Sequence, residues 1–187
     1  MPDSSRSYFG SAVVPFRLVF LMWLVFSLQF YLQLDLSIFM LRPRNVWGIL
    51  GIFFSPMLHG NVFHLVSNTV PLLFLGGTLF FFYNRIGTVV FFRCYLLTNV
   101  LVWIFAPPIP VIGASGLIYG LSSFLIFFGV LRRDVMSILI SIVVIILYGG
   151  IFYGVLPTDP GVSWQSHLAG AIVGLATAFM LKDTKKV

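Results

Sequence analysis

The stretch Ala106–Arg133, APPIPVIGASGLIYGLSSFLIFFGVLRR, sets the organisation of this chain. Its first part carries Pro107, Pro108 and Pro110 and cannot be helical. Its second part, from Ser115 to Leu131, is an apolar run of about 17 residues that would form a helix of about 25 Å. Such a helix is slightly shorter than the roughly 30 Å hydrocarbon core of a bilayer. Apolar but non-helical backbone beside it is tolerated at membrane depth only where protein covers it or where it lines a cavity.

The composition of the whole chain agrees with a membrane protein. Hydrophobic residues make up 59% of the 187 residues and charged residues 9%, and the mean hydropathy is +1.05. A net charge of +6 could indicate a nucleic-acid partner, but the basic residues lie between apolar runs. Membrane topology therefore explains them, and no nucleic-acid partner is expected. The single cysteine, Cys94, lies within an apolar run and is interpreted as a packing residue.

Six apolar segments predict an all-α, polytopic membrane protein: a single domain over residues 1–187 built as a bundle of six transmembrane helices. The segments cover approximately residues 14–34, 59–83, 86–106, 115–131, 135–155 and 164–181. The first is too long for the core of a signal peptide and contains Arg17 and Gln29, so it is expected to stay in the mature protein. We find no internal repeat and no second domain.

The basic residues predict the orientation. With six crossings, one side of the membrane receives Arg6, Arg17, Arg85, Arg93, Arg132, Arg133, Lys182, Lys185 and Lys186. Only Arg42 and Arg44 fall on the other side, so the positive-inside rule places both termini in the cytoplasm. The connection over residues 35–58 mixes apolar and basic residues and is expected to lie in the interface or to be partly embedded. The short stretch before Val14 lacks an organellar presequence, which favours a prokaryotic plasma membrane.

Polar side chains inside membrane spans are costly, so they mark candidate functional residues. All three histidines lie at such positions: His59 and His64 open the second segment, and His167 lies near the start of the sixth. Asn68 follows His64 by one helical turn, and Ser115 opens the fourth segment. Alternating topology brings all five to the outer half of the membrane, which predicts one shared site.

The residue types suggest nucleophilic chemistry, because a serine hydroxyl becomes a good nucleophile when an imidazole takes its proton. His167 is the best base for Ser115, since it lies on a different segment and precedes Gly170 and Gly174, a pair that allows close helix packing. No Asp or Glu lies within any predicted segment, so the expected arrangement is a dyad.

Two sources of oxyanion donors are visible. His64 and Asn68 are about 40° apart on a helical wheel and can face one site. The backbone N–H of Ser115 lies at a helix N-terminus, where Gly113 and Gly116 allow close approach of the backbone.

These motifs together resemble those of the rhomboid proteases. Gly113–Gly116 (GASG) resembles the family's GxSG, and His59, His64 and Asn68 resemble its H-x4-H-x3-N. His167 before a Gly-x-x-x-Gly pair resembles the sixth-helix motif. Tyr119 matches the tyrosine that stacks on the catalytic histidine in the family.

The resemblance implies a rhomboid-like bundle and a serine endopeptidase that needs no metal or other cofactor. It implies that Ser115 is the nucleophile, His167 the base, and His64, Asn68 and the Ser115 N–H the oxyanion donors, with His59 in a supporting role. The substrates it implies are transmembrane proteins in the lipid bilayer whose helices unwind easily. This sequence has Trp47-Gly48 where many members have Trp-Arg, a departure that affects the anchoring of the first loop.

Three other interpretations remain. A zinc site from the three histidines is disfavoured, because the step from His59 to His64 turns a helix by about 140° and no carboxylate supports it. A rhomboid-like scaffold that binds membrane helices without cleaving them is the alternative from another functional class. A transporter or channel is less favoured, since the segments carry no acidic relay residues. The substrate, its entry gate and the oligomeric state are left open by the sequence.

Overall fold

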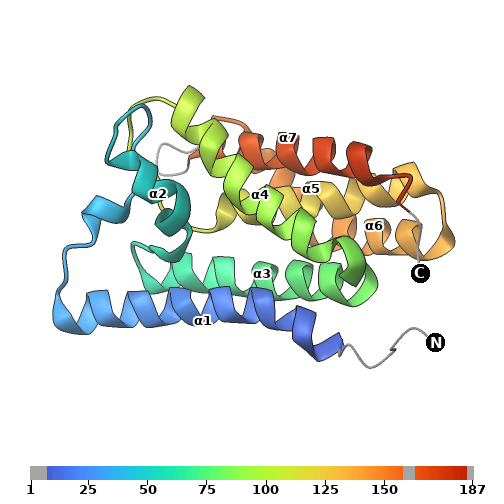
Figure 1. Cartoon of the computed structure of the whole chain (residues 1–187), viewed down its shortest axis with the longest axis horizontal. Helices are drawn as coiled ribbons and strands as arrows, with labels where there is room; N and C mark the ends of the chain where they lie inside the picture. The colour runs from blue at the N-terminus through green and yellow to red at the C-terminus, as the bar shows by residue number, and fades with distance from the viewer. Residues whose placement is uncertain (1–7, 158–162, 185–187) are drawn as a thin grey trace.

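The computed structural model describes residues 8–157 and 163–184, and within them every regular element is a helix (Figure 1). The α-helices are α1 (Tyr8–Leu32), α2 (Gly48–Phe54), α3 (Val62–Phe82), α4 (Asn84–Phe105), α5 (Ser115–Arg132), α6 (Val135–Tyr148) and α7 (Trp164–Leu181). Three 3-10 helices join them: η1 (Ser37–Phe39), η2 (Ser55–Met57) and η3 (Gly149–Val155). Helices α1, α3, α4, α5 and α7 are long and apolar enough to cross a membrane. The predicted fold class, an all-α membrane bundle, is confirmed.

The fifth predicted segment, residues 135–155, differs from a continuous transmembrane α-helix. The α-helix α6 ends at Tyr148, and the chain continues to Val155 as the 3-10 helix η3. Gly149, Gly150 and Gly154 weaken α-helix propagation here, because glycine has high backbone freedom. The two parts together are about 35 Å long, from about 21 Å of α-helix and about 14 Å of 3-10 helix.

Helix α5 lies at the centre of the bundle and contacts α3, α4, α6 and α7. Its contact with α7 is the most extensive in the molecule and depends on glycines. A Cβ atom added to Gly170 would collide with the carbonyl oxygen of Gly116, and one added to Gly174 would collide with that of Gly120. Small residues therefore allow the two backbones to approach closely, as in other membrane helix pairs.

The first connection packs against the bundle beside α4. The hydroxyl of Tyr95 donates to the carbonyl of Phe53 at 2.5 Å, and Asn99 Nδ2 donates to that of Ile52 at 3.1 Å. Leu41 is fully buried and pairs through its backbone with Val111 of the proline-rich segment. These contacts hold the connection against the segment that leads to α5.

Glycine at position 48 follows from the packing of this connection. A Cβ atom on Gly48 would collide with the backbone of Arg42. The departure from the Trp-Arg pattern thus coincides with a backbone contact that only glycine permits.

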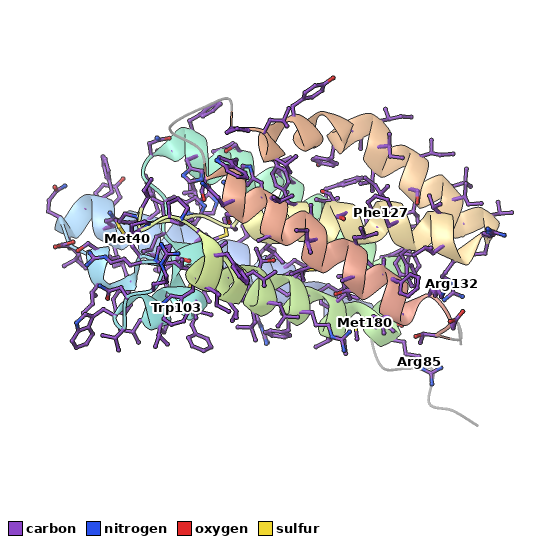
Figure 2. The ribbon with its side chains drawn as sticks, turned by 90° about the horizontal axis from the view of Figure 1, so that it is seen from above. Met40, Arg85, Trp103, Phe127, Arg132 and Met180 are labelled. Atoms are coloured by element: carbon purple, nitrogen blue, oxygen red, sulfur yellow. The ribbon has the colours of Figure 1, made fainter. Side chains whose placement is uncertain are left out.

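Two of the predicted cytoplasmic arginines, Arg85 and Arg132, lie at one end of the bundle (Figure 2). The start of α1 and the end of α7 lie at this end (Figure 1). Figure 2 shows Met40 and Trp103 at the opposite end. Arg44 lies at that opposite end, where its backbone N–H donates to the carbonyl of Trp103. The predicted cytoplasmic residues Arg6, Lys185 and Lys186 lie outside the described residues.

Candidate active site

Ser115 and His167 meet at the start of α5 and α7. The Nε2 atom of His167 lies 2.9 Å from Oγ of Ser115, and its Nδ1 atom lies 2.9 Å from the carbonyl oxygen of Gly154. A carbonyl oxygen only accepts, so the bond to Gly154 requires the proton on Nδ1. In a neutral imidazole Nε2 is then a lone-pair acceptor directed at the serine hydroxyl. This is the tautomer that a general base needs.

Tyr119 and Gly154 fix the plane of the His167 ring. The Tyr119 ring stacks on it with centroids 3.9 Å apart and planes inclined by 7°. Tyr119 lies one helical turn after Ser115, so both residues face His167 from α5. A Cβ atom on Gly154 would collide with the Tyr119 hydroxyl and lie 3.2 Å from His167 Nδ1. Position 154 therefore has no room for a side chain while the ring is stacked.

No sequence motif points to Gly154 as part of the site. Its contribution is a backbone carbonyl, which every residue type supplies, so no motif based on side chains reveals it. The available signal is indirect: the predicted segments contain no acid, so the orienting acceptor of the histidine is expected to be a neutral group.

His64 reaches the segment just before Ser115. Its position in the first turn of α3 is set by Asn61, the N-cap residue, whose side-chain oxygen accepts from the backbone N–H of His64 at 2.8 Å. A Cβ atom on Gly113 would lie 2.7 Å from His64 Nε2. Gly113 has φ +97°, a left-handed conformation that favours glycine, and its N–H donates to the carbonyl of Ser55 at 2.9 Å. The imidazole thus packs on the loop two residues from the serine.

Asn68 is buried one turn further along α3. Its Nδ2 atom donates to the backbone carbonyl of His64 at 2.8 Å. Its Oδ1 atom has no hydrogen-bond partner within the part of the chain that the structure describes. The structure therefore places Asn68 beside His64, on the same helix, with a second amide hydrogen on Nδ2 that this bond does not use.

His59 corrects one expectation. It does not belong to the second helix, because α3 begins at Val62, after the capping residue Asn61. His59 is buried in the preceding turn, with Nδ1 3.3 Å from the carbonyl oxygen of Met57 and its ring edge-on to His64 at 4.9 Å. Burial, with a smaller contribution from His64, lowers the pKa of His59 to about 4. The neutral ring of His59 therefore packs against the His64 ring and helps to hold it in position.

Because His59 precedes α3, helical geometry does not set the angle between His59 and His64. The described residues nevertheless contain no group of three or more His, Cys, Asp or Glu side chains placed to hold a metal ion. The two rings of His59 and His64 pack edge to face, which is a packing contact.

The N-terminus of α5 supplies backbone donors at the serine. Ala114 is the N-cap residue and has no side-chain capping bond, and the first α-helical bond runs from the N–H of Ile118 to the carbonyl of Ala114. The N–H groups of Ser115, Gly116 and Leu117 precede that bond, so the helix offers them no acceptor. On the far side of this turn, a Cβ atom on Gly116 would lie 2.6 Å from Oγ of Ser166 on α7. Because Gly116 has no side chain, α7 can pack close enough to α5 for His167 to reach Ser115.

Comparison with known proteins extends this picture to a family. The family model described as Rhomboid domain matches residues 43–184. Uncharacterized proteins from Mycobacterium bovis and Mycobacterium tuberculosis are each 35% identical over 163 residues, which cover 78% of this chain and 65% of the relative. An uncharacterized protein from Mycobacterium leprae is 37% identical over 164 residues, covering 79% of this chain and 61% of the relative. The matched part thus spans a little under two thirds of each relative's length. The family match covers more than half of the chain, and the chain therefore belongs to the rhomboid family of membrane proteins.

Proposed function

We propose that this protein is an intramembrane serine endopeptidase that uses Ser115 as nucleophile and His167 as general base. The observation that carries the proposal is the 2.9 Å contact between His167 Nε2 and Ser115 Oγ, with Nδ1 oriented by the Gly154 carbonyl. A nucleophile within hydrogen-bond reach of a base, which is itself oriented by a third group, is the geometry of covalent acyl transfer. Membership of the rhomboid family supports the same chemistry.

The reaction would proceed in two halves. Ser115 Oγ attacks the carbonyl carbon of the scissile peptide bond while its proton passes to His167 Nε2. The tetrahedral intermediate collapses when His167 returns this proton to the leaving nitrogen, which departs as an amine and leaves an ester on Ser115. A water molecule, deprotonated by His167, then attacks the ester and releases the carboxylic acid with the free serine.

The negative oxygen of the intermediate would be stabilised by donors from two elements. The Ser115 N–H belongs to the uncapped start of α5, where the helix dipole also favours negative charge. The His64 ring packs on Gly113, and Asn68 lies one turn beyond it. Donors held in place before the reaction stabilise developing charge without reorganisation, and removing one of them typically costs about 10²-fold or more in rate.

The third member of this site would be a neutral main-chain group. The Gly154 carbonyl can fix the tautomer of His167 and hold the ring, as a carboxylate does in a triad. It carries only a dipole, so it stabilises the imidazolium less than a carboxylate would. A dyad oriented in this way fits a segment in which a buried carboxylate would be expensive.

The proposed substrates are transmembrane proteins. A peptide bond inside a stable helix has its carbonyl hydrogen-bonded, so the substrate must unwind locally before Ser115 can attack it. The position of Arg85 and Arg132 at one end of the bundle (Figure 2) supports an orientation with both termini in the cytoplasm and the site in the outer half of the membrane. A prokaryotic plasma membrane, and a single domain that includes α1 as well as the matched residues 43–184, also belong to this proposal.

The test is cleavage of a fluorescent transmembrane substrate by the protein reconstituted in liposomes. Wild type is compared with Ser115→Ala and His167→Ala, and with Ser122→Ala as a matched control on the same helix. We expect both site variants to lose activity by at least about 10³-fold, while Ser122→Ala and added chelator leave it near wild type.

Activity that persists in Ser115→Ala would contradict the nucleophile assignment. A folded wild type that binds transmembrane segments but cleaves none of several such substrates would instead support a helix-binding scaffold.

A further inference from the structure

A groove of about 430 Å³ lies between α1, α4 and the end of the first connection, away from the serine site. Leu18 and Leu21 of α1 line one side, and Phe92 and Leu96 of α4 line the other. Phe53 and Met57 complete the lining next to the first connection, at what we call the inner end of the groove. The lining is almost entirely apolar, and Arg17 is the charged residue among it. The shape and chemistry of such a groove suit a long apolar chain with a polar end.

The groove is open because α1 leans on α3 rather than on α4, as Figure 1 shows. Two contacts fix this position. A Cβ atom on Gly76 would lie 2.6 Å from Cβ of Pro15, so the two helices touch there. Further along, the indole N–H of Trp23 donates to the hydroxyl of Thr69 at 3.0 Å. Protein side chains do not fill the space between α1 and α4, and the surroundings of a membrane protein supply lipid to fill it.

Arg17 lines the groove, and Arg85 lies outside the lining residues, near the start of α4. Arg17 lies on α1, and Arg85 lies on α4 seven residues before Phe92, two turns away on the same face of the helix. Long side chains lean toward the N-terminus of their helix, so Arg17 extends toward the end of the bundle where Figure 2 shows Arg85. Both residues are exposed. Within residues 8–157 and 163–184 the one ion pair joins Arg132 and Asp134, so neither arginine has an acidic partner there.

The inner end of the groove offers no comparable polar group. The Tyr95 hydroxyl, which lies there, already donates to the carbonyl of Phe53. A polar small molecule would therefore find its partners only at the end with the arginines, whereas an acyl chain would match the rest of the groove.

We infer that the groove between α1 and α4 binds an anionic phospholipid, with an acyl chain along Leu21 and Leu96 and its phosphate group between Arg17 and Arg85. Basic residues between membrane helices favour anionic head groups, and each contributes about 1 kcal/mol near the surface. That contribution equals roughly a fivefold change in affinity per arginine. This inference is independent of proteolysis, since the groove contains none of the proposed catalytic groups.

The test is native mass spectrometry of the full-length protein in detergent, titrated with phosphatidylglycerol or with phosphatidylcholine of the same acyl chains. We expect phosphatidylglycerol to bind more tightly, by up to about 25-fold if both arginines contribute fully. Arg17→Gln and Arg85→Gln should each weaken phosphatidylglycerol binding about fivefold and leave phosphatidylcholine binding unchanged. Arg133→Gln removes the same charge from the end of α5 and serves as the control that keeps the preference.

A second variant tests the apolar part of the site. Leu21→Trp enlarges a side chain that lines the groove and should weaken both lipids while the arginines stay in place. Equal affinity of the wild type for the two lipids would overturn the inference. It would also be overturned if Arg17→Gln and Arg133→Gln reduced the preference equally, or if a second copy of the chain occupied the groove, seen as a dimer that excludes phospholipid.

Discussion

Helices α5 and α6 follow one another in the chain and are both apolar, yet they occupy opposite environments. Helix α5 is buried around most of its circumference, whereas α6 buries one stripe of Ser137, Ile140, Ser141 and Val144. The outward face of α6 consists of isoleucine, leucine, valine and one methionine, Met136, that remain exposed on the bundle. The central helix carries three glycines and two serines that contact its neighbours or fill the interior, namely Gly116, Gly120, Gly129, Ser122 and Ser123.

The difference shows what marks the interior of a membrane protein. Lipid tails are as apolar as leucine, so hydrophobicity does not separate a central helix from a peripheral one. Small residues do distinguish a central helix, because they let backbones approach each other and bring functional groups on neighbouring helices within reach. The contact between α5 and α7 at Gly116 and Gly170 is also what places His167 beside Ser115.

The largest effect on stability should come from filling the contact between α5 and α7. In Gly170→Val the new side chain collides with the Gly116 carbonyl, and we expect the free energy of unfolding to fall by about 3 kcal/mol. Ala176→Val adds two methyl groups on the exposed side of the same helix and should change it by less than about 0.5 kcal/mol. Unfolding in mixed micelles measures both. Equal losses in the two variants would show that close backbone contact does not hold this pair.

The next effect concerns η3, which holds the acceptor of His167. The side chain of Gly154→Val would collide with the Tyr119 hydroxyl and crowd His167 Nδ1. This displaces the His167 ring from Ser115, and we expect cleavage to fall on the order of 10²-fold. Gly150→Val makes the same change four residues earlier, where no atom lies within 4 Å of an added Cβ. Its activity should stay near wild type in the liposome assay. If the two variants lost activity equally, the conformation of η3 rather than the Gly154 contact would be responsible.

A smaller effect is expected from the stack on His167. Tyr119→Ala removes a ring that lies 3.9 Å from the imidazole, and we expect the cleavage rate to drop roughly fivefold to tenfold. Tyr119→Phe keeps the stacked ring and should stay within about twofold of wild type. The rates of the two variants at saturating substrate provide the comparison. An equal loss in both would assign the effect to the hydroxyl.

The smallest effect tests the buried stripe of α6. The Ser141 hydroxyl donates to the carbonyl of Ile126 at 2.7 Å, so Ser141→Ala should lower the free energy of unfolding by about 0.6 kcal/mol. Val143→Ala, on the exposed face, should cost less than this in the same measurement. A greater cost for Val143→Ala would mean that the outward face of α6 packs against protein.

The sequence was sufficient to predict the elements in which polar and apolar residues contrast sharply. The predicted segment 164–181 coincides with α7, and the segment from Ser115 coincides with the start of α5. The proximity of Ser115 and His167 could also be inferred, because alternating topology puts both at the outer ends of their segments and Gly170 and Gly174 favour close helix packing.

Other features are visible only in the folded structure. The carbonyl of Gly154 has no residue signal, and η3 departs from an α-helix because of local glycines that hydropathy does not weigh. The displacement of His59 from the second helix was foreseeable from Asn61, a good N-cap residue three positions before His64. A prediction from apolar length alone begins this helix at His59, whereas α3 begins at Val62.

The most direct test of the central claim is covalent labelling of the reconstituted protein with a fluorophosphonate, followed by mass spectrometry of the modified peptide. A serine activated by a histidine attacks the phosphorus and releases fluoride, so no substrate has to be known. We predict one adduct, on Ser115, that disappears in His167→Ala and persists in Ser122→Ala. An unmodified Ser115 in folded wild-type protein, or equal labelling in His167→Ala, would contradict the proposal that these two residues form a catalytic dyad.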